Sequence, residues 1–390
     1  MKLLVIGLGQ CGSNVADQFA WLNKRARRQR GIEICTGVFA VNTDLADLSG
    51  LHYIKPDYRH RILIGGRKAG GHGVGKINEL GAEIAREDAD KVIDAIRQTP
   101  RFFESDAFLL IAGAAGGTGS GSISVLSQLI KERYIDKPLY NLIVLPFEHE
   151  ERTEERTIYN SATCLKSCNA VADAIFLVDN QRYIRKNASL KNNLAQINNL
   201  IVEPFYNILC AGEEKKAKYV GTRLLDAGDI IQSIAGWTVI GYGRSQLPFF
   251  RLPFKAKDFR EKGTETHRGI EAMDEAISEL SFPCDPEDAA RALYLVSAPT
   301  KEMNLSVIKE LGEYLRVLAP EAILRNGDYP RGDGHLDVSL ILSELKNVEK
   351  VKRYYLEATK VVSSTGERQR QIENKLKEIE EYSKAVPSLV

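Results

Sequence analysis

The stretch Gly113-Ala114-Ala115-Gly116-Gly117-Thr118-Gly119-Ser120-Gly121 decides the fold that this sequence predicts. It follows an apolar run at Ala107–Ala112, which we expect to be a buried strand, and it begins a helix. Five glycines, two alanines and two hydroxyl residues make a loop that can wrap backbone N–H groups around phosphate oxygens. A flexible linker has a similar composition, but a linker is not expected between a buried strand and an amphipathic helix. The stretch therefore predicts a phosphate-binding loop.

A second glycine-rich turn, Gly7-Leu8-Gly9-Gln10-Cys11-Gly12, follows an apolar strand at Lys2–Ile6 and begins a helix that we expect to end near Trp21. The N-terminus of that helix offers unpaired N–H groups and a positive dipole end to a phosphate. A dinucleotide-binding Rossmann domain begins in the same way. Asp44 follows the second strand, Cys35–Val41, so this motif alone leaves a nicotinamide-dependent dehydrogenase open.

The rest of the first half predicts an α/β fold. Apolar strands that alternate with helices indicate a Rossmann-like parallel sheet covered on both faces. A long helix follows, and beyond Asp226 strands and helices mix, which predicts a second, mixed α/β domain. The remaining expected elements are a helix at Ile77–Ile96, strands at Tyr140–Leu145 and Ala174–Val178, the long helix at Leu194–Cys210, strands at Trp237–Tyr242, Ala292–Val296, Ala322–Arg325 and Leu336–Leu342, and polar helices from Leu345 onward, broken near Ser363.

Composition and charge exclude some classes of function. The 390 residues are 44% hydrophobic and 27% charged, as in ordinary globular proteins, and the net charge of +1 gives no bulk attraction to nucleic acid. We expect the basic run Lys24–Arg30 to be a solvated connection, with a filament-side or lipid-surface contact as the alternative. The six cysteines lack metal-binding spacing, so we expect buried thiols rather than metal ligands, and we assign no metal-binding residue. With no signal peptide or transmembrane run, we expect a cytoplasmic protein.

The loop Gly113–Gly121 resembles the signature of the tubulin/FtsZ superfamily, which has the form Gly-Gly-Gly-Thr-Gly-[Ser/Thr]-Gly. This sequence keeps Gly116–Gly121 but has Ala115 where many relatives have glycine, a mild change if that residue does not need positive φ. The turn that contains Gly9 then resembles the first nucleotide loop of the family. Asn42–Asp44 resembles the second loop, and Gly70–Gly75 resembles the third, which faces the γ-phosphate in the family.

The third loop also fits a different motif. Gly70–Lys76 has the form Gly-x-x-x-x-Gly-Lys, which begins a P-loop. The next residue is Ile77, which has no hydroxyl that could bind magnesium. We therefore reject a P-loop.

Two further segments resemble the parts of the family that contact ribose and base. Pro146–Glu151 resembles the family's Pro-Phe-x-x-Glu-Gly segment but has Glu151 where glycine is usual, so the resemblance implies a ribose contact by Glu150 or Glu151. The expected arginine falls out of register, between Arg152 and Arg156. By resemblance, Asn180 and Asn198 flank the guanine, since an amide offers both a donor and an acceptor. Each asparagine could instead be a turn or cap residue.

The last motif concerns hydrolysis. Asp226 and Asp229 lie three residues apart at the expected start of a helix, where acids also serve as caps. In the family an Asp-x-x-Asp pair occupies this place and faces the nucleotide of the next subunit, where a carboxylate can orient the attacking water. FtsZ proteins often carry asparagine where this chain has Leu224.

The second half resembles the CetZ branch most, through Asn326–Pro330 and the strand after it. The end of the chain, Ala385–Val390, lacks the adaptor-binding tail of FtsZ and the acidic tail of tubulins. The resemblance implies a GTPase with the tubulin/FtsZ fold that binds GTP or GDP with Mg²⁺ and assembles with itself, head to tail, into filaments. It favours a role in cell shape, with FtsZ-like division as the alternative and with any membrane or adaptor partner unknown.

The resemblance also divides the chain and assigns residues. The expected parts are a GTP-binding domain (1–193), the central helix with the acidic loop (194–235), a C-terminal activation domain (236–345) and a helical extension (346–390). The catalytic residues are Asp226 and Asp229. The nucleotide-binding residues are Gly9, Gln10, Cys11, Asn14, Asn42, Asp44, Gly71, Gly73, Gly113, Ala114, Gly116, Gly117, Thr118, Gly119, Ser120, Glu150 or Glu151, Asn180 and Asn198.

Overall fold

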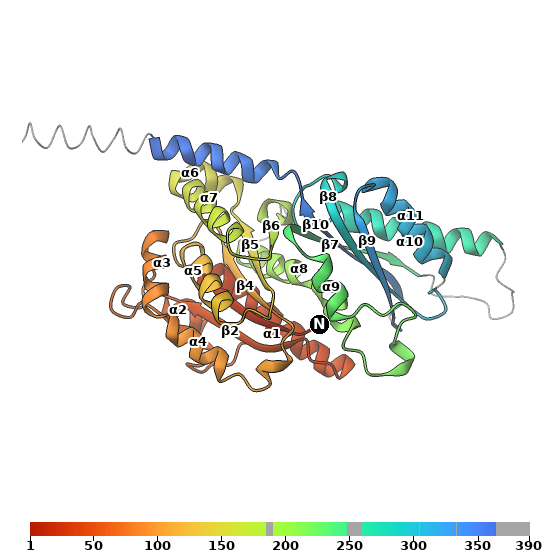
Figure 1. Ribbon diagram of the computed structural model, residues 1–390, viewed down its shortest axis with the longest axis horizontal. Coiled ribbons are helices and arrows are strands. Elements are labelled where there is room, and N and C mark those ends of the chain that lie inside the picture. Colours follow the sequence, from red (N-terminus) through yellow and green to blue (C-terminus); the bar gives the residue numbers. More distant parts are fainter. Residues whose placement is uncertain (185–189, 248–258, 304, 333, 364–390) are drawn as a thin grey trace, which may run out of the picture.

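A single mixed sheet runs through the computed structural model, which describes residues 1–184, 190–247, 259–303, 305–332 and 334–363 (Figure 1). Within these residues the strand order is β3-β2-β1-β4-β5-β6-β7-β10-β8-β9. The strands are β1 (Leu3–Leu8), β2 (Cys35–Asn42), β3 (Arg61–Leu63), β4 (Ala107–Gly113), β5 (Leu139–Leu145), β6 (Ala174–Asp179), β7 (Gly236–Gln246), β8 (Ala289–Ala298), β9 (Ile323–Pro330) and β10 (His335–Leu345).

The strands from β3 to β7 pair in parallel, which confirms the predicted parallel sheet. β1 pairs with β4 from Leu3↔Ala107 to Leu8↔Ala112 without a register shift. β10 is antiparallel to both β7 and β8, so the second half of the sheet is mixed, as predicted. Since β1, β4, β5 and β6 all run in one direction, their carboxyl ends meet at a single edge of the sheet.

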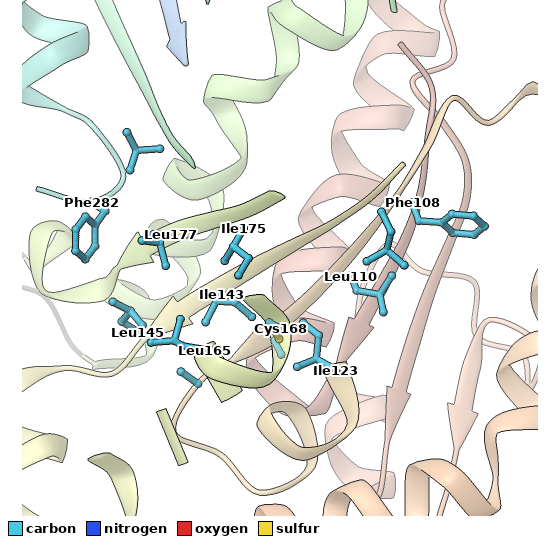
Figure 2. Packing of buried hydrophobic residues seen from close by; sticks show 14 of the residues in the cluster. Phe108, Leu110, Ile123, Ile143, Leu145, Leu165, Cys168, Ile175, Leu177 and Phe282 are labelled. Atoms are coloured by element: carbon cyan, nitrogen blue, oxygen red, sulfur yellow. The ribbon is translucent and has the colours of Figure 1, made fainter. Parts of the chain in front are cut away.

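Helices cover both faces of the sheet. In the first half, α1 and α8 pack on one face and α3, α5 and α7 on the other. Figure 2 shows the second layer, where Ile123 of α5 and Leu165 of α7 lie over Leu110, Ile143 and Leu177 of the strands. The helices are α1 (Gly9–Arg30), α2 (Leu45–Ser49), α3 (Asn78–Glu87), α4 (Ala89–Arg97), α5 (Thr118–Arg133), α6 (Glu148–Thr153), α7 (Glu155–Asn169), α8 (Leu190–Ala211), α9 (Ala227–Ser233), α10 (Phe259–Ser278) and α11 (Leu305–Leu318).

A further helix, residues 349–363, follows β10 and is called the C-terminal helix below. The expected break begins at Ser363, the last described residue, and the rest of it lies outside the described part of the chain. The tail Ala385–Val390 lies wholly outside the described residues. In the part of the chain that the structure describes, no helix has the length and hydropathy needed to cross a bilayer. The proposed domain boundaries remain predictions.

The expectation that the basic run Lys24–Arg30 is a connection was wrong, because α1 continues to Arg30 and ends at Gly31, which has φ 73°. Two arginines of the run bind α8. The guanidinium of Arg25 lies 2.7 Å from Glu203, and the buried Arg30 donates to the side-chain oxygen of Asn207 at 2.8 Å. These long-range contacts stabilise the last turns of α1, and local sequence does not reveal them.

The expected single helix Ile77–Ile96 was also wrong, since it is divided into α3 and α4 at Asp88. The Asp88 carboxylate accepts a hydrogen bond from the backbone N–H of Gly65 at 2.6 Å, and its backbone leaves the helical region (φ −103°, ψ 11°). The short strand β3 was missed because it is only three residues long. The long helix α8 begins at Leu190, before the expected Leu194.

Candidate functional site

A cavity of about 480 Å³ opens at the carboxyl ends of β1, β4, β5 and β6. Its lining includes two glycine-rich loops, one after β1 and one after β4, and residues of the amino-terminal part of α8. Most of the residues that the sequence assigned to nucleotide binding line this cavity. They are Gly9, Gln10, Cys11, Asn14, Asn42, Gly113, Gly116, Gly117, Thr118, Gly119, Glu150, Asn180 and Asn198.

Two helices begin at the cavity with uncapped N-termini. α1 follows Leu8 and α5 follows Gly117, and neither residue has a side-chain oxygen that could accept from the first turn. The N–H groups of a first turn have no partner within the helix, and the positive end of the helix dipole lies there. Two such ends at one cavity favour a ligand with several negative charges, such as a polyphosphate.

The glycines of the loop after β4 allow close packing rather than unusual backbone angles. A Cβ at Gly119 would lie 2.7 Å from the carbonyl oxygen of Leu8, and one at Gly117 would lie 2.9 Å from the backbone nitrogen of Ile77. Among the described non-glycine residues, positive φ occurs at Lys76, Arg101 and Glu344. Ala115 is not among them, so its position does not require glycine. Alanine in place of the glycine that many relatives have is therefore a mild change.

Asn160 of α7 holds this loop in place, and the sequence analysis missed it. Its fully buried side-chain amide donates to the carbonyl oxygens of Ala115 at 3.0 Å and Gly116 at 3.3 Å, and to that of Lys76 at 2.9 Å. A single amide thus joins the loop after β4 to the end of the third loop. Its position in the middle of an amphipathic helix gave no signal of this role.

The second loop places a carboxylate at the cavity that the sequence analysis also missed. Asp47 lines the cavity and accepts from the amide groups of Gln10 and Asn42, each at 2.9 Å. Asp44 lies outside the lining, where its side chain caps α2 by accepting from the Asp47 N–H at 3.0 Å. The available sequence signal for Asp47 was its position three residues after Asp44, at the start of the short helix α2.

The third loop supports the second loop and contributes a cation. Gly71 and Gly73 lie outside the lining; the Gly71 carbonyl accepts from Leu45, and the Gly73 N–H donates to Thr43 at 3.2 Å. Both glycines have positive φ, 83° and 78°, which explains their residue type. Lys76, at the end of this loop, lines the cavity and pairs with Glu154 at 2.6 Å. The rejected P-loop match had drawn attention to this lysine, but not as a cation at the cavity.

Two predicted residues of the phosphate loop do not line the cavity. Ala114 and Ser120 are buried outside the lining, and the Ser120 hydroxyl donates to the carbonyl of Gly116. Burial, with the nearby Glu150 carboxylate, raises the pKa of the Cys11 thiol to about 12. Cys11 is therefore neutral at pH 7 and adds no negative charge beside a phosphate.

Only one of the two candidate glutamates faces the cavity. Glu150 lines it, and its carboxylate also accepts from the Phe147 N–H at 3.0 Å at the start of α6. Glu151 lies outside the lining and points toward the C-terminal helix, because consecutive residues of a helix are about 100° apart. His149 also lines the cavity, with its ring stacked on Phe147 at 5.5 Å.

The acidic pair lies far from this cavity within one protomer. Asn198 is at the cavity, and α8 then continues for thirteen residues to Ala211, about 20 Å at 1.5 Å per residue. Beyond that end, the backbone of Asp226 packs against Gly212. Asp226 is exposed and caps α9 by accepting from the Asp229 N–H at 2.8 Å. Asp229 is half-buried and pairs with Arg325 at 2.7 Å.

Comparison with known proteins identifies the family. Residues 2–187 match the model for the Tubulin/FtsZ family, GTPase domain, and residues 187–360 match that for Tubulin-like CetZ, C-terminal domain. The tubulin-like protein CetZ1 of Haloferax volcanii is 33% identical over 369 residues, 90% of each chain. This chain belongs to the tubulin-like CetZ family. The assignment confirms the predicted superfamily, fold and GTPase class, and it removes the dehydrogenase alternative.

Solved CetZ structures have the same fold. The GDP-bound monomer of CetZ1 from Haloferax volcanii aligns with a TM-score of 0.79 at 30% identity, over 93% of this chain and 99% of that one. The GTPγS-bound protofilament of CetZ2 from the same organism also aligns with a TM-score of 0.79, at 25% identity, over 94% and 100% of the two chains.

The cavity of this CetZ-family chain also suits Mg²⁺ held mainly by a nucleotide. The described residues contain no cluster of three or more His, Cys, Asp or Glu side chains that could hold a metal alone. Mg²⁺ commonly takes phosphate oxygens, waters and one or two protein oxygens. The Thr118 hydroxyl and the Asp47 carboxylate are oxygen donors in the lining, so the residues present fit an ion that arrives with its nucleotide.

Proposed function

We propose that this chain binds GTP with Mg²⁺ in the cavity, polymerises head to tail, and hydrolyses GTP at the contact between protomers. The two uncapped helix ends receive the phosphates, Asn180 and Asn198 bind the guanine, and Glu150 binds the ribose. Lys76 adds a positive charge on the phosphate side. The bound Mg²⁺ would neutralise phosphate charge as the bond to the γ-phosphate breaks.

The observation that carries this proposal is the separation of the acids from the cavity along α8. Asp226 and Asp229 cannot reach a nucleotide in their own protomer across about 20 Å of helix. A copy stacked head to tail brings its acidic loop to the open side of the cavity. There the two carboxylates orient and polarise the attacking water. Such a contact does not close on itself, so it generates a filament.

We assign the filament a cytoskeletal role in cell shape, in the cytoplasm. All six cysteines lie in the described part of the chain and are free, which suits a reducing compartment. We also propose the domain division at residues 193, 235 and 345. It places the nucleotide cavity and the acidic loop at the two ends of the central helix.

Sedimentation tests the proposal with wild type, Asp226→Asn and Asp229→Asn. Asparagine keeps the N-cap of α9, whereas alanine at Asp226 would also cost about 1 kcal/mol of cap stability. We expect all three proteins to pellet with GTP or a non-hydrolysable analogue. The variants should release phosphate at least about a hundredfold more slowly, as expected when a group that orients the nucleophile is lost.

Asp285→Asn is the matched control, because Asp285 caps the short 3-10 helix Pro286–Asp288 in the same way. It should assemble and hydrolyse GTP as wild type does. Soluble Asp226→Asn and Asp229→Asn proteins with normal turnover would contradict the assigned role of the acids.

A further inference from the structure

The C-terminal helix packs into an apolar cluster of the core that includes residues of α7. Its residues Val351, Tyr354 and Ala358 are buried and belong to the same apolar cluster as Leu165 and Cys168 of α7. In Figure 1 this helix, in blue, lies beside α6 and α7. A segment that follows the last strand of the sheet therefore returns to the elements that border the nucleotide cavity.

Three polar side chains of this helix bind two carboxylates. The Lys350 ammonium lies 2.8 Å from Asp179 and 3.5 Å from Glu151. The Tyr354 hydroxyl donates to Glu151 at 2.5 Å, and the Arg353 guanidinium lies 2.7 Å from the other oxygen of Glu151. The side chains of Asp179 and Glu151 are only 6% and 9% exposed. Charge-assisted hydrogen bonds at buried sites are strong, and a carboxylate left there without its partner is costly.

Each carboxylate is adjacent in sequence to a residue that lines the cavity. Glu151 follows Glu150, and Asp179 precedes Asn180. Asp179 also accepts from the Gln181 N–H at 3.1 Å, which caps the short 3-10 helix Asn180–Tyr183. A backbone shift at either residue would therefore also shift a residue that lines the cavity.

The same two loops are also tied to each other. The backbone N–H of Glu148, at the start of α6, donates to the side-chain oxygen of Gln181 at 3.3 Å. The C-terminal helix thus holds a pair of loops that already act as one unit.

We propose that Lys350 and Tyr354 are positioning residues, which hold the loops after β5 and β6 so that Glu150 and Asn180 face the ribose and base of the nucleotide. The inference rests on the proposed GTP site and adds a contribution from the C-terminal helix to its affinity and base selectivity. Neither residue lines the cavity, so each acts through the carboxylate that it binds. Burial and the Glu151 carboxylate raise the pKa of Tyr354, so its hydroxyl remains a donor at neutral pH.

Nucleotide binding by the full-length protein, below its assembly concentration, tests this proposal. The dissociation constants for GTP and ATP are measured for wild type, Lys350→Met, Lys350→Arg and Tyr354→Phe. We expect Lys350→Met to weaken GTP binding about tenfold and to lower the preference for GTP over ATP. Lys350→Arg should keep most of the GTP affinity and most of the preference for GTP over ATP, since arginine keeps the charge-assisted contact. Tyr354→Phe should weaken GTP binding by a smaller factor.

Lys352→Met is the matched control. Lys352 lies on the same helix but is exposed, and it contacts the side chain of Asn347. This variant should bind both nucleotides as wild type does. Thermal unfolding without nucleotide checks that each variant is folded. If Lys350→Met does not fold, Tyr354→Phe carries the test, because it removes a single hydroxyl.

Two results would overturn the inference. One is a folded Lys350→Met protein with wild-type affinity and selectivity. The other is an equal loss of GTP and ATP binding that arginine does not restore, which would indicate a general structural role. Failure of the wild type to bind GTP would instead reject the proposed function, so the two failures are distinguishable.

Discussion

At the scale of single residues, the glycines around the cavity differ in what a side chain would meet. A Cβ at Gly121 would lie 2.0 Å from the carbonyl oxygen of Asn78, which belongs to α3. At Gly116, no described atom outside the neighbouring residues lies within 4 Å of the same position. The number of glycines predicted a phosphate loop. Which of them tolerate a methyl group depends on partners distant in sequence, such as Asn78.

This difference gives a paired prediction. Gly121→Ala should lower the free energy of unfolding by about 1–3 kcal/mol or more, because the methyl group forces the first turn of α5 away from α3. Gly116→Ala should leave stability unchanged within about 0.5 kcal/mol. Urea unfolding of the two variants, followed by circular dichroism, measures both values. Equal stabilities would show that close packing does not explain the glycine at position 121.

At the scale of elements, α7 supports the phosphate loop through Asn160. Asn160→Ala removes an amide that donates to the carbonyl groups of three half-buried residues, so it should lower the free energy of unfolding by about 1–3 kcal/mol. It should also weaken GTP binding, because the loop loses its link to the end of the third loop. Equilibrium unfolding and nucleotide titration test the two effects together.

Asn141→Ala is the control for this prediction. Asn141 of β5 is also fully buried, and its amide donates to Ser127 at 2.9 Å, away from the cavity lining. The loss of stability should be similar, with GTP affinity retained. Were Asn141→Ala to weaken binding as much as Asn160→Ala, a specific support of the loop by α7 would be ruled out.

The elements of the fold were largely predictable where the pattern is local. Apolar runs and glycine turns located β1, β2, β4, β5 and β6. Their alternation with helices predicted that these strands pair in parallel. The end of α1 was missed although Gly31, in the left-handed conformation, is a local signal for a helix C-terminus. The break at Asp88 was not predictable, because its carboxylate binds the backbone of Gly65, which is distant in sequence. The contacts of Asn160 were missed for a similar reason: a lone polar residue without a motif carries no signal of what it faces.

At the scale of the whole molecule, α8 separates the cavity from the acidic loop, the two halves of the proposed shared site. The cavity lies at its amino-terminal part, and the acidic loop lies beyond its carboxyl end. In a single protomer the Asp229 carboxylate pairs with Arg325 at 2.7 Å, a contact between α9 and β9. The sequence suggested a shared site only by resemblance, since the distance between the half-sites depends on how the chain folds.

The rate of GTP turnover per protomer, measured as a function of protein concentration, tests this separation most directly. If the acids act only on a neighbour's nucleotide, turnover per protomer should be very low in dilute solution. It should rise steeply over the range in which sedimentation detects filaments, and then level off when assembly is complete. A turnover per protomer that stays constant across that range would contradict the shared site.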